Sequence, residues 1–239
     1  FNLKGGYTIL KIKDPNYLRR TLKIFIIALI IMLIAFILAF IFSPSLETFK
    51  KLTSGEHSKI STSYGLSKVW QFILNNAFQV PFQMFILSLI PIPFLYFLNI
   101  ISTSIITGIV SAFALHLNFS KSIVMIIASI PHITIELLAM AFVISPLYKL
   151  NQSIIRKVSN LFRNNKKENI SFRITVINLF KIYLLYALPL YIIAAFLETY
   201  FTALYIIYSL NKKSHFFILR KEEFTMPDIT SFIVIFILC

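Results

Sequence analysis

The sequence predicts an all-α polytopic membrane protein, a transmembrane helical bundle of about five spans, with a re-entrant half-helix near the C-terminus as one option. Two observations lead to this prediction. Of 239 residues, 58% are hydrophobic and 13% charged, whereas a soluble domain carries about 25% charged residues. The apolar residues also form long stretches without a charge, separated by basic segments. An α-helix needs about 20 such residues to cross a bilayer.

The net charge of +14 fits this interpretation. Because the basic residues gather between the apolar stretches, they are typical of membrane topology and of contact with anionic lipid headgroups. We therefore expect the lipid bilayer, and not nucleic acid, as the partner of these charges. The sequence contains no glycine-rich phosphate loop, so we expect no bound cofactor, and any ATP would be used by a partner protein.

The first span is expected near residues 24–43. The preceding segment is basic and contains one acidic residue, Asp14, which predicts a cytoplasmic N-terminus. A polar loop over residues 43–70 follows. Residues Gly65–Ala77 predict an amphipathic helix at the membrane surface.

Residues 69–120 contain no Asp, Glu, Lys or Arg. This length accommodates two spans, near residues 78–98 and 101–115, with a turn near Asn99–Ser104. Pro91 and Pro93 are expected to break or kink the first of them. The second contains small residues at every fourth position, which favour close approach of helices but also occur in ordinary packing: Ser104, Gly108 and Ala112.

The fourth span is expected near residues 122–145. The segment after it is the most basic in the chain, which again predicts a cytoplasmic location, and Ser153–Phe162 predict a basic helix on the inner surface. The fifth span is expected near residues 176–199. Either it is tilted, or the chain breaks at Glu198 and returns as a half-span. Residues 1–210 would then form a single transmembrane domain and residues 211–239 a C-terminal tail.

Ionisable side chains inside two of these spans are the candidate functional residues. Pro131, His132 and Glu136 lie in the fourth span, and His132 and Glu136 share a helix face because they are four residues apart. Glu198 lies in the fifth span, four residues before Thr202. An ionisable group at membrane depth costs about 2.5 kcal/mol or more and usually faces the interior of the bundle. We expect these side chains to meet there.

Four interpretations of this cluster are open. It could be a buried polar network that joins the fourth and fifth spans, which is the interpretation we favour. It could be a catalytic site of a membrane-embedded peptidase or cyclase, with a glutamate activating water and His132 polarising a carbonyl. It could be a relay for protons or substrate. A zinc or iron site is the fourth, but three ligands without a cysteine or second histidine are few, so no metal site is assigned. Asn75, Asn76 and Asn99 are expected to act as helix caps and interhelical hydrogen-bonding groups.

The arrangement of these residues resembles the stage II sporulation protein M family. The resemblance covers roughly residues 15–210. It rests on Asn75-Asn76, Asn99, the run Pro131-His132-x-x-x-Glu136, and the run Ala194-Ala-x-x-Glu198-x-x-x-Thr202. Ile100 and Ile133 stand where the family usually has glycine, which indicates a divergent member.

The resemblance implies a bacterial membrane protein of about five spans that serves an envelope or export complex. The founding member of the family acts with a peptidoglycan-degrading machine, and it looks like the membrane anchor and scaffold of that machine. Genes of related proteins occur beside genes for circular bacteriocins, ATPases or transporters. We therefore expect a non-catalytic scaffold in the bacterial cytoplasmic membrane that acts in an envelope or peptide export, maturation or immunity complex. Expected partners are other membrane proteins, such as an ATPase subunit or a second copy of the chain, and a hydrophobic peptide.

Overall fold

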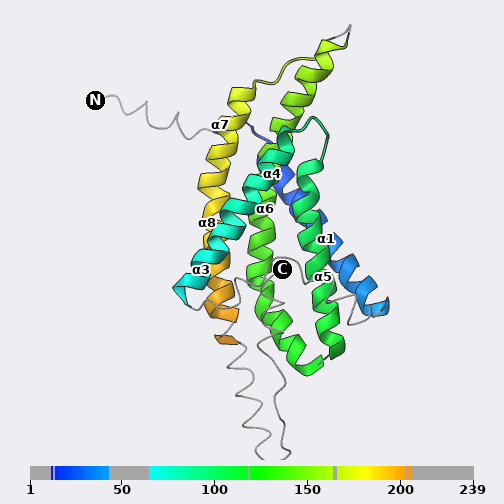
Figure 1. Cartoon of the computed structure of the whole chain (residues 1–239), viewed down its shortest axis with the longest axis vertical. Helices are drawn as coiled ribbons and strands as arrows, with labels where there is room; N and C mark the ends of the chain where they lie inside the picture. Colours follow the sequence, from blue (N-terminus) through cyan, green and yellow to red (C-terminus); the bar gives the residue numbers. More distant parts are fainter. Residues whose placement is uncertain are drawn as a thin grey trace, which may run out of the picture. The chain divides into compact units, whose positions relative to one another are not determined.

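The computed structural model describes residues 12, 14–42, 65–117, 119–163, 166–202, 204 and 205. Within these residues every regular element is a helix (Figure 1). Five helices are long and apolar enough to cross a membrane: Tyr17–Phe42, Leu66–Leu89, Leu95–His116, Phe119–Leu161 and Phe172–Phe201. The predicted fold class, an all-α polytopic membrane protein, is confirmed.

Several of these long helices are built from consecutive segments of different helix type. The elements are α1 (Tyr17–Phe42), α3 (Leu66–Phe72), the π-helix η3 (Ile73–Gln79), α4 (Val80–Leu89), the 3₁₀ turn η4 (Leu95–Phe97), α5 (Leu98–Leu117), α6 (Phe119–Leu161), α7 (Phe172–Ile182), the π-helix η5 (Tyr183–Ala187), α8 (Leu188–Phe196) and the π-helix η6 (Leu197–Phe201).

The chain divides into two compact units. The first consists of Phe1–Ala28, Leu74–Ile101 and Ile135–Ile192, and the second of Leu29–Ile73, Ser102–Thr134 and Ile193–Cys239. Each long helix therefore supplies residues to both units.

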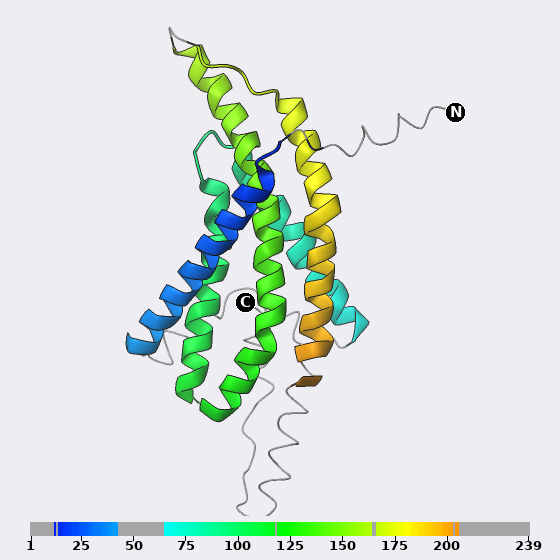
Figure 2. The ribbon, with the colours of Figure 1, turned by 180° about the vertical axis from the view of Figure 1, so that it is seen from behind.

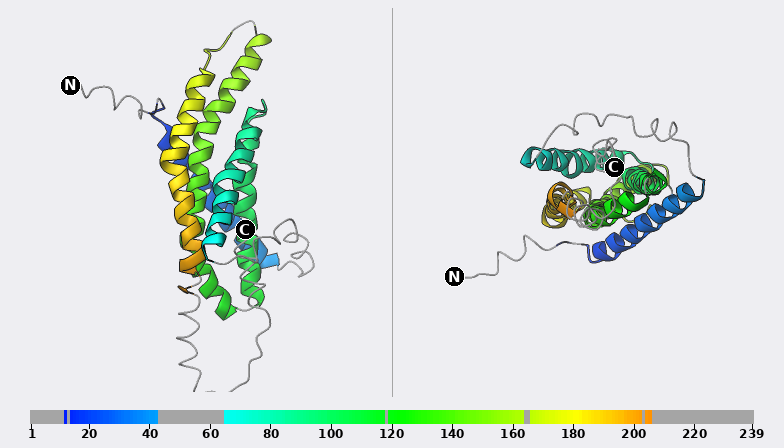
Figure 3. Two further views of the ribbon diagram at one scale, coloured as in Figure 1. Left: turned by 60° about the vertical axis from the view of Figure 1, so that its left-hand side comes forward. Right: turned by 90° about the horizontal axis from the view of Figure 1, so that it is seen from below.

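In the first unit, α7 and η5 run beside the second part of α6 (Figure 3). The side chains of Met84, Ile144, Leu147 and Ile182 are fully buried there. In the second unit, the end of α5 and the start of α6 form a helical hairpin (Figure 2). Its core contains Val110, Phe113, Met125 and Ala128. Both cores are apolar, as the sequence pattern predicts.

Pro81 leaves one backbone carbonyl of its helix without an N–H donor, and a tyrosine from another helix supplies the donor. A proline has no N–H, so Pro81 cannot donate to the carbonyl of Ala77 four residues earlier. The Tyr183 hydroxyl donates to that carbonyl oxygen instead. Inside a bilayer no water would replace the missing donor. The hydrogen bond therefore stabilises the junction of η3 and α4 and joins it to η5.

The predicted turn near Asn99–Ser104 is wrong, because α5 is helical from Leu98 to Leu117. The span predicted near residues 101–115 lies within the helix Leu95–His116, and the one predicted near residues 78–98 extends past the end of the helix Leu66–Leu89. The helix containing α4 ends at Leu89, and the next begins with η4 at Leu95. Pro91 and Pro93 end the helix, because proline lacks an N–H and forces the preceding residue out of the helical conformation. Ile90 is accordingly extended, with φ −72° and ψ 131°.

Asn151 of α6 holds the end of α4 in place. Its side-chain Nδ2 donates to the carbonyl oxygens of Ser88, at 2.9 Å, and Ile90, at 2.8 Å. The Asn151 side chain is buried, with 2% of its surface exposed. It thus satisfies two of the carbonyl groups that a helix C-terminus leaves unpaired.

The other span boundaries also differ from the predicted ones. Leu66–Leu89 is one continuous helix, so Gly65–Ala77 is no separate surface helix. The span predicted at 122–145 is part of α6, which has 43 residues and includes Ser153–Leu161. A helix of that length extends about 65 Å, roughly twice the hydrocarbon thickness of a bilayer. The span predicted at 176–199 lies within a helix that continues through Glu198 without a break. The predicted tail at 211–239 lies outside the described residues.

Gly108 of α5 allows α1 to approach closely in the second unit. A Cβ atom at Gly108 would lie 2.4 Å from the Met32 carbonyl oxygen and 2.9 Å from the Phe36 nitrogen. Both are backbone atoms that cannot move aside alone. At Gly108 the small-residue stripe is therefore a close contact of helices, and its other two members, Ser104 and Ala112, are fully buried.

An ion pair holds the start of α1 against α6 in the first unit. The Arg20 guanidinium pairs with Asp14 and also donates to the Ser145 carbonyl, at 3.2 Å. The Ser145 hydroxyl in turn donates to the Tyr17 carbonyl, at 2.8 Å. Burial acts to raise the pKa of the Asp14 carboxyl, but the hydrogen bond and the charge of Arg20 outweigh it and keep this pKa below its usual value.

We expect Tyr183→Phe to lower the free energy of unfolding by about 1–3 kcal/mol, because the Ala77 carbonyl is left unpaired. In a Pro81→Ala background the same change should cost close to nothing, because the alanine N–H can bond that carbonyl. Thermal unfolding of the four proteins in detergent measures this coupling. Tyr200→Phe, at an exposed tyrosine, is the control. An equal cost in both backgrounds would contradict the assignment.

We expect Asp14→Asn to lower stability by about 1–2 kcal/mol at pH 7. The folded-state pKa of Asp14 is depressed, so its stabilisation is present above the unfolded-state value and is lost as the pH falls through the folded-state value. The difference between the wild type and Asp14→Asn should therefore shrink below about pH 4. Unfolding curves at pH 7 and pH 3 test this, with the exposed Glu168→Gln as control. A difference that does not depend on pH would argue against the ion pair.

Candidate functional site

His132 and Thr202 lie together in the interior of the second unit. The Thr202 hydroxyl is 3.3 Å from Nδ1 of His132 and 3.3 Å from the Ala128 carbonyl oxygen. The exposed fractions of the two side chains are 3% for His132 and 4% for Thr202. Ala128 and His132 are one turn apart on α6, so a single hydroxyl reaches both. The structure thus joins two of the residues that the sequence singles out.

Glu198 has a charged neighbour that the sequence analysis missed. Its side chain is buried, with 5% exposed, and lies in η6 near the end of its long helix. The Lys68 ammonium, in the first turn of α3, lies within electrostatic range of the Glu198 carboxyl. The sequence predicts Lys68 to lie in the polar loop over residues 43–70. The signal that could have found it is the apolar run that begins at Val69, directly after the lysine.

Glu136 belongs to the first unit and has a tyrosine as its neighbour. The Glu136 side chain is 9% exposed and that of Tyr191, in α8, is 1% exposed. The two groups lie within electrostatic range of each other. In the part of the chain that the structure describes, the Tyr191 hydroxyl has no hydrogen-bond partner.

The predicted meeting of Glu136 with Glu198 stays a prediction. Glu136 is part of the first unit, whereas His132 and Glu198 are part of the second. His132 and Glu136 are both on α6, four residues apart and after Pro131. Among the described residues, no group of three His, Cys, Asp or Glu side chains is arranged to hold a metal ion.

The three asparagines all take part in side-chain hydrogen bonds. Nδ2 of Asn75 donates to the side-chain oxygen of Asn76, at 2.7 Å, within η3. Nδ2 of Asn99 donates to the side-chain oxygen of Gln83, at 3.1 Å, across the turn between α4 and α5. The Asn99 bond is interhelical, as expected. The Asn75–Asn76 bond is local, within η3.

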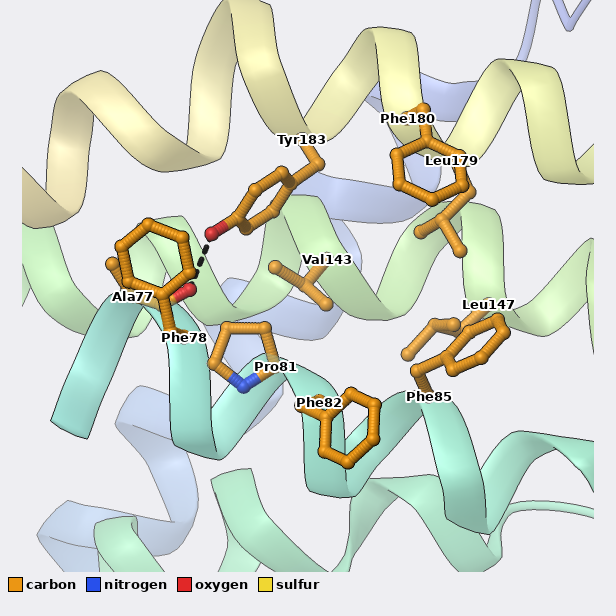
Figure 4. Close-up of a pocket in the computed structure, with 10 residues that line it drawn as sticks. All are labelled: Ala77, Phe78, Pro81, Phe82, Phe85, Val143, Leu147, Leu179, Phe180 and Tyr183. Atoms are coloured by element: carbon orange, nitrogen blue, oxygen red, sulfur yellow. Dashed lines mark hydrogen bonds between the residues drawn. The ribbon is translucent and has the colours of Figure 1, made fainter. Parts of the chain in front are cut away.

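An apolar pocket of about 340 Å³ lies in the first unit, between η3–α4, α6 and α7–η5 (Figure 4). Phe78, Phe82 and Phe180 form part of its wall. The main polar group of the pocket is the Tyr183 hydroxyl, which already donates a hydrogen bond to the Ala77 carbonyl oxygen (Figure 4). This pocket is not lined by His132, Glu136 or Glu198. Its chemistry suits hydrocarbon and offers nothing for acid–base work.

A family model for stage II sporulation protein M matches residues 21–203. That match includes all five long helices in whole or in part, together with Lys68, His132, Glu136 and Glu198. The chain belongs to the stage II sporulation protein M family. A comparison with curated proteins and one with solved structures gave no match. Membership of the stage II sporulation protein M family and the five apolar helices together identify a membrane protein.

Two neighbouring threonines provide a matched test of the His132 hydrogen bond. Thr202→Val removes the hydroxyl bonded to His132 and should lower stability by about 1–3 kcal/mol, because a buried polar group of His132 loses its hydrogen-bond partner. Thr199→Val makes the same chemical change at a buried hydroxyl with no partner among the described residues. It should be neutral or stabilising. Thermal unfolding in detergent distinguishes them, and equal effects would contradict the assigned hydrogen bond.

Proposed function

We propose that this member of the stage II sporulation protein M family is a non-catalytic membrane scaffold. It would act in the bacterial cytoplasmic membrane, with its N-terminus inside, as part of an envelope or peptide export, maturation or immunity complex. The observation that carries the proposal is the hydrogen bonding of His132. Its Nδ1 is engaged by the Thr202 hydroxyl, deep in the unit. This contact joins α6 to the end of the fifth long helix and supports a structural role for the imidazole.

The pocket of Figure 4 and the cavity at Lys149, described below, are lined by residues other than His132, Glu136 and Glu198. Neither of these two cavities therefore brings a substrate beside the acid–base groups that an embedded peptidase or cyclase would use. The basic segments at residues 14–23 and 149–173 support the cytoplasmic placement of these ends.

A second candidate, a proton-coupled transport subunit, is favoured by one observation. The Glu136 carboxyl is buried within electrostatic range of the Tyr191 hydroxyl, which has no hydrogen-bond partner among the described residues. Buried ionisable groups of this kind are typical of proton pathways in membrane proteins. The two candidates make different demands on the charge of Glu136, because a proton carrier must ionise and a structural carboxylic acid need not.

The substitution Glu136→Gln separates the two candidates. A tagged full-length chain is purified in mild detergent from its producing cell, and the copurifying proteins are identified. For a scaffold, Glu136→Gln should retain these proteins and the function of the complex, because glutamine has the shape of a neutral carboxyl group. The control is Glu168→Gln, on the surface.

The opposite result would be an unchanged set of copurifying proteins with loss of pH-driven transport in reconstituted vesicles. That outcome would replace the scaffold with the transport subunit. A purification in which wild-type chain brings down no membrane protein and forms no oligomer would contradict both candidates.

A further inference from the structure

A second cavity in the first unit lies where three segments meet at the ends of their apolar stretches. Its volume is about 350 Å³. Asp14–Asn16, just before α1, form one wall. Pro146 and Lys149 of α6 form another, and the start of α7 with Ile170 and Ser171 forms the third. Each segment changes from polar to apolar at this level, so the cavity is placed at a membrane–water boundary.

The lining of this cavity is amphipathic. Pro15, Pro146, Ile170 and Ile174 supply apolar surface, while Asn16, Ser171, Thr175 and Asn178 supply polar groups. The apolar pocket of Figure 4 has a quite different lining, dominated by phenylalanine and leucine. A ligand of the second cavity must therefore have a polar part and a hydrocarbon part.

Lys149 gives the cavity a positive charge. The acidic group in the lining, Asp14, is already paired with Arg20. Lys149 has no ion-pair partner within the described ranges, and its ammonium makes one long contact, 3.5 Å, to the Gln152 side chain. Asp14 lies within electrostatic range of Lys149 as well. With two cations to one carboxylate, the net charge favours an anion.

The sequence around Lys149 also carries a net positive charge. Between Lys149 and Arg173 the acidic residue is Glu168, against Lys149, Arg156, Lys157, Arg163, Lys166, Lys167 and Arg173. The first turn of α7 also borders the cavity, and the Ser171 side chain makes no capping hydrogen bond. The amide groups of that turn add partial positive charge, in support of the charge on Lys149.

We propose that this cavity binds the headgroup of an anionic phospholipid, with Lys149 facing the phosphate. The apolar part of the lining packs against the glycerol and the beginning of the acyl chains. Basic pockets between transmembrane helices at the cytoplasmic surface bind such headgroups in other membrane proteins. Free phosphate offers the same anionic group, but it has nothing to cover the apolar wall.

Native mass spectrometry of the purified full chain tests the proposal. Phosphatidylglycerol, phosphatidylcholine or inorganic phosphate is titrated into the protein in detergent. The wild type should bind phosphatidylglycerol more tightly than phosphatidylcholine. Lys149→Gln should weaken phosphatidylglycerol binding about fivefold, since one lysine near an anionic surface contributes about that factor. Lys149→Arg should retain the preference, which shows that the cavity still folds.

Lys166→Gln is the matched control, because it removes the same charge from an exposed position outside the cavity. It should leave phosphatidylglycerol binding unchanged. If Lys166→Gln and Lys149→Gln weakened phosphatidylglycerol binding equally, the binding would be due to diffuse surface charge and not to the cavity, and the proposal would be overturned. Unchanged binding in Lys149→Gln would overturn it too. Displacement of phosphatidylglycerol by millimolar inorganic phosphate would assign the site to the free anion instead.

Discussion

The structure depends on one constraint, which is that backbone hydrogen-bonding groups inside a membrane must find partners within the protein. Two interruptions of the second long helix show how the chain meets it. Because Pro81 has no N–H, the Ala77 carbonyl lacks its helical donor, and the Tyr183 hydroxyl donates a hydrogen bond to it instead. At the end of α4 the amide of Asn151 covers the carbonyls of Ser88 and Ile90. Both donors come from helices distant in the sequence, so the interruptions themselves fix how the first unit packs.

These hydrogen bonds also explain which boundaries could be predicted from the sequence. The number of spans follows from the length of the apolar stretches, because hydrocarbon thickness sets the length of a helix. The turn at residues 90–94 was missed although Pro91 and Pro93 mark it. Apolar residues continue on both sides, so hydropathy alone does not separate the two helices. The cap that stabilises the turn, Asn151, lies 61 residues beyond Ile90 and has no local signal.

The candidate site could be predicted only in part, because the sequence shows local patterns but not which helices pack together. Periodicity predicts which residues share a helix face, and a buried histidine needs a partner, so the Thr202–His132 contact could be expected. Lys68 and Tyr191 were missed because they stand at a helix start and in an aromatic-rich helix, where lysine and tyrosine are common. Only the packing of α3 near Glu198, and of α8 near Glu136, brings these side chains to the carboxyl groups.

The length of α6 has an electrostatic consequence. From Lys149 to the end of the helix at Leu161 the axis rises about 18 Å, which is more than twice the Debye length of about 8 Å at physiological salt. Arg163, Lys166 and Lys167, which follow this end of the helix, are therefore screened from Lys149 and from the group that Lys149 faces, whereas Arg173 lies at the start of α7 beside the cavity. The basic segment therefore consists of two electrostatically separate parts. Lys149 lies at the level of the lipid headgroups, and the cations beyond the end of α6 act on the surrounding solution.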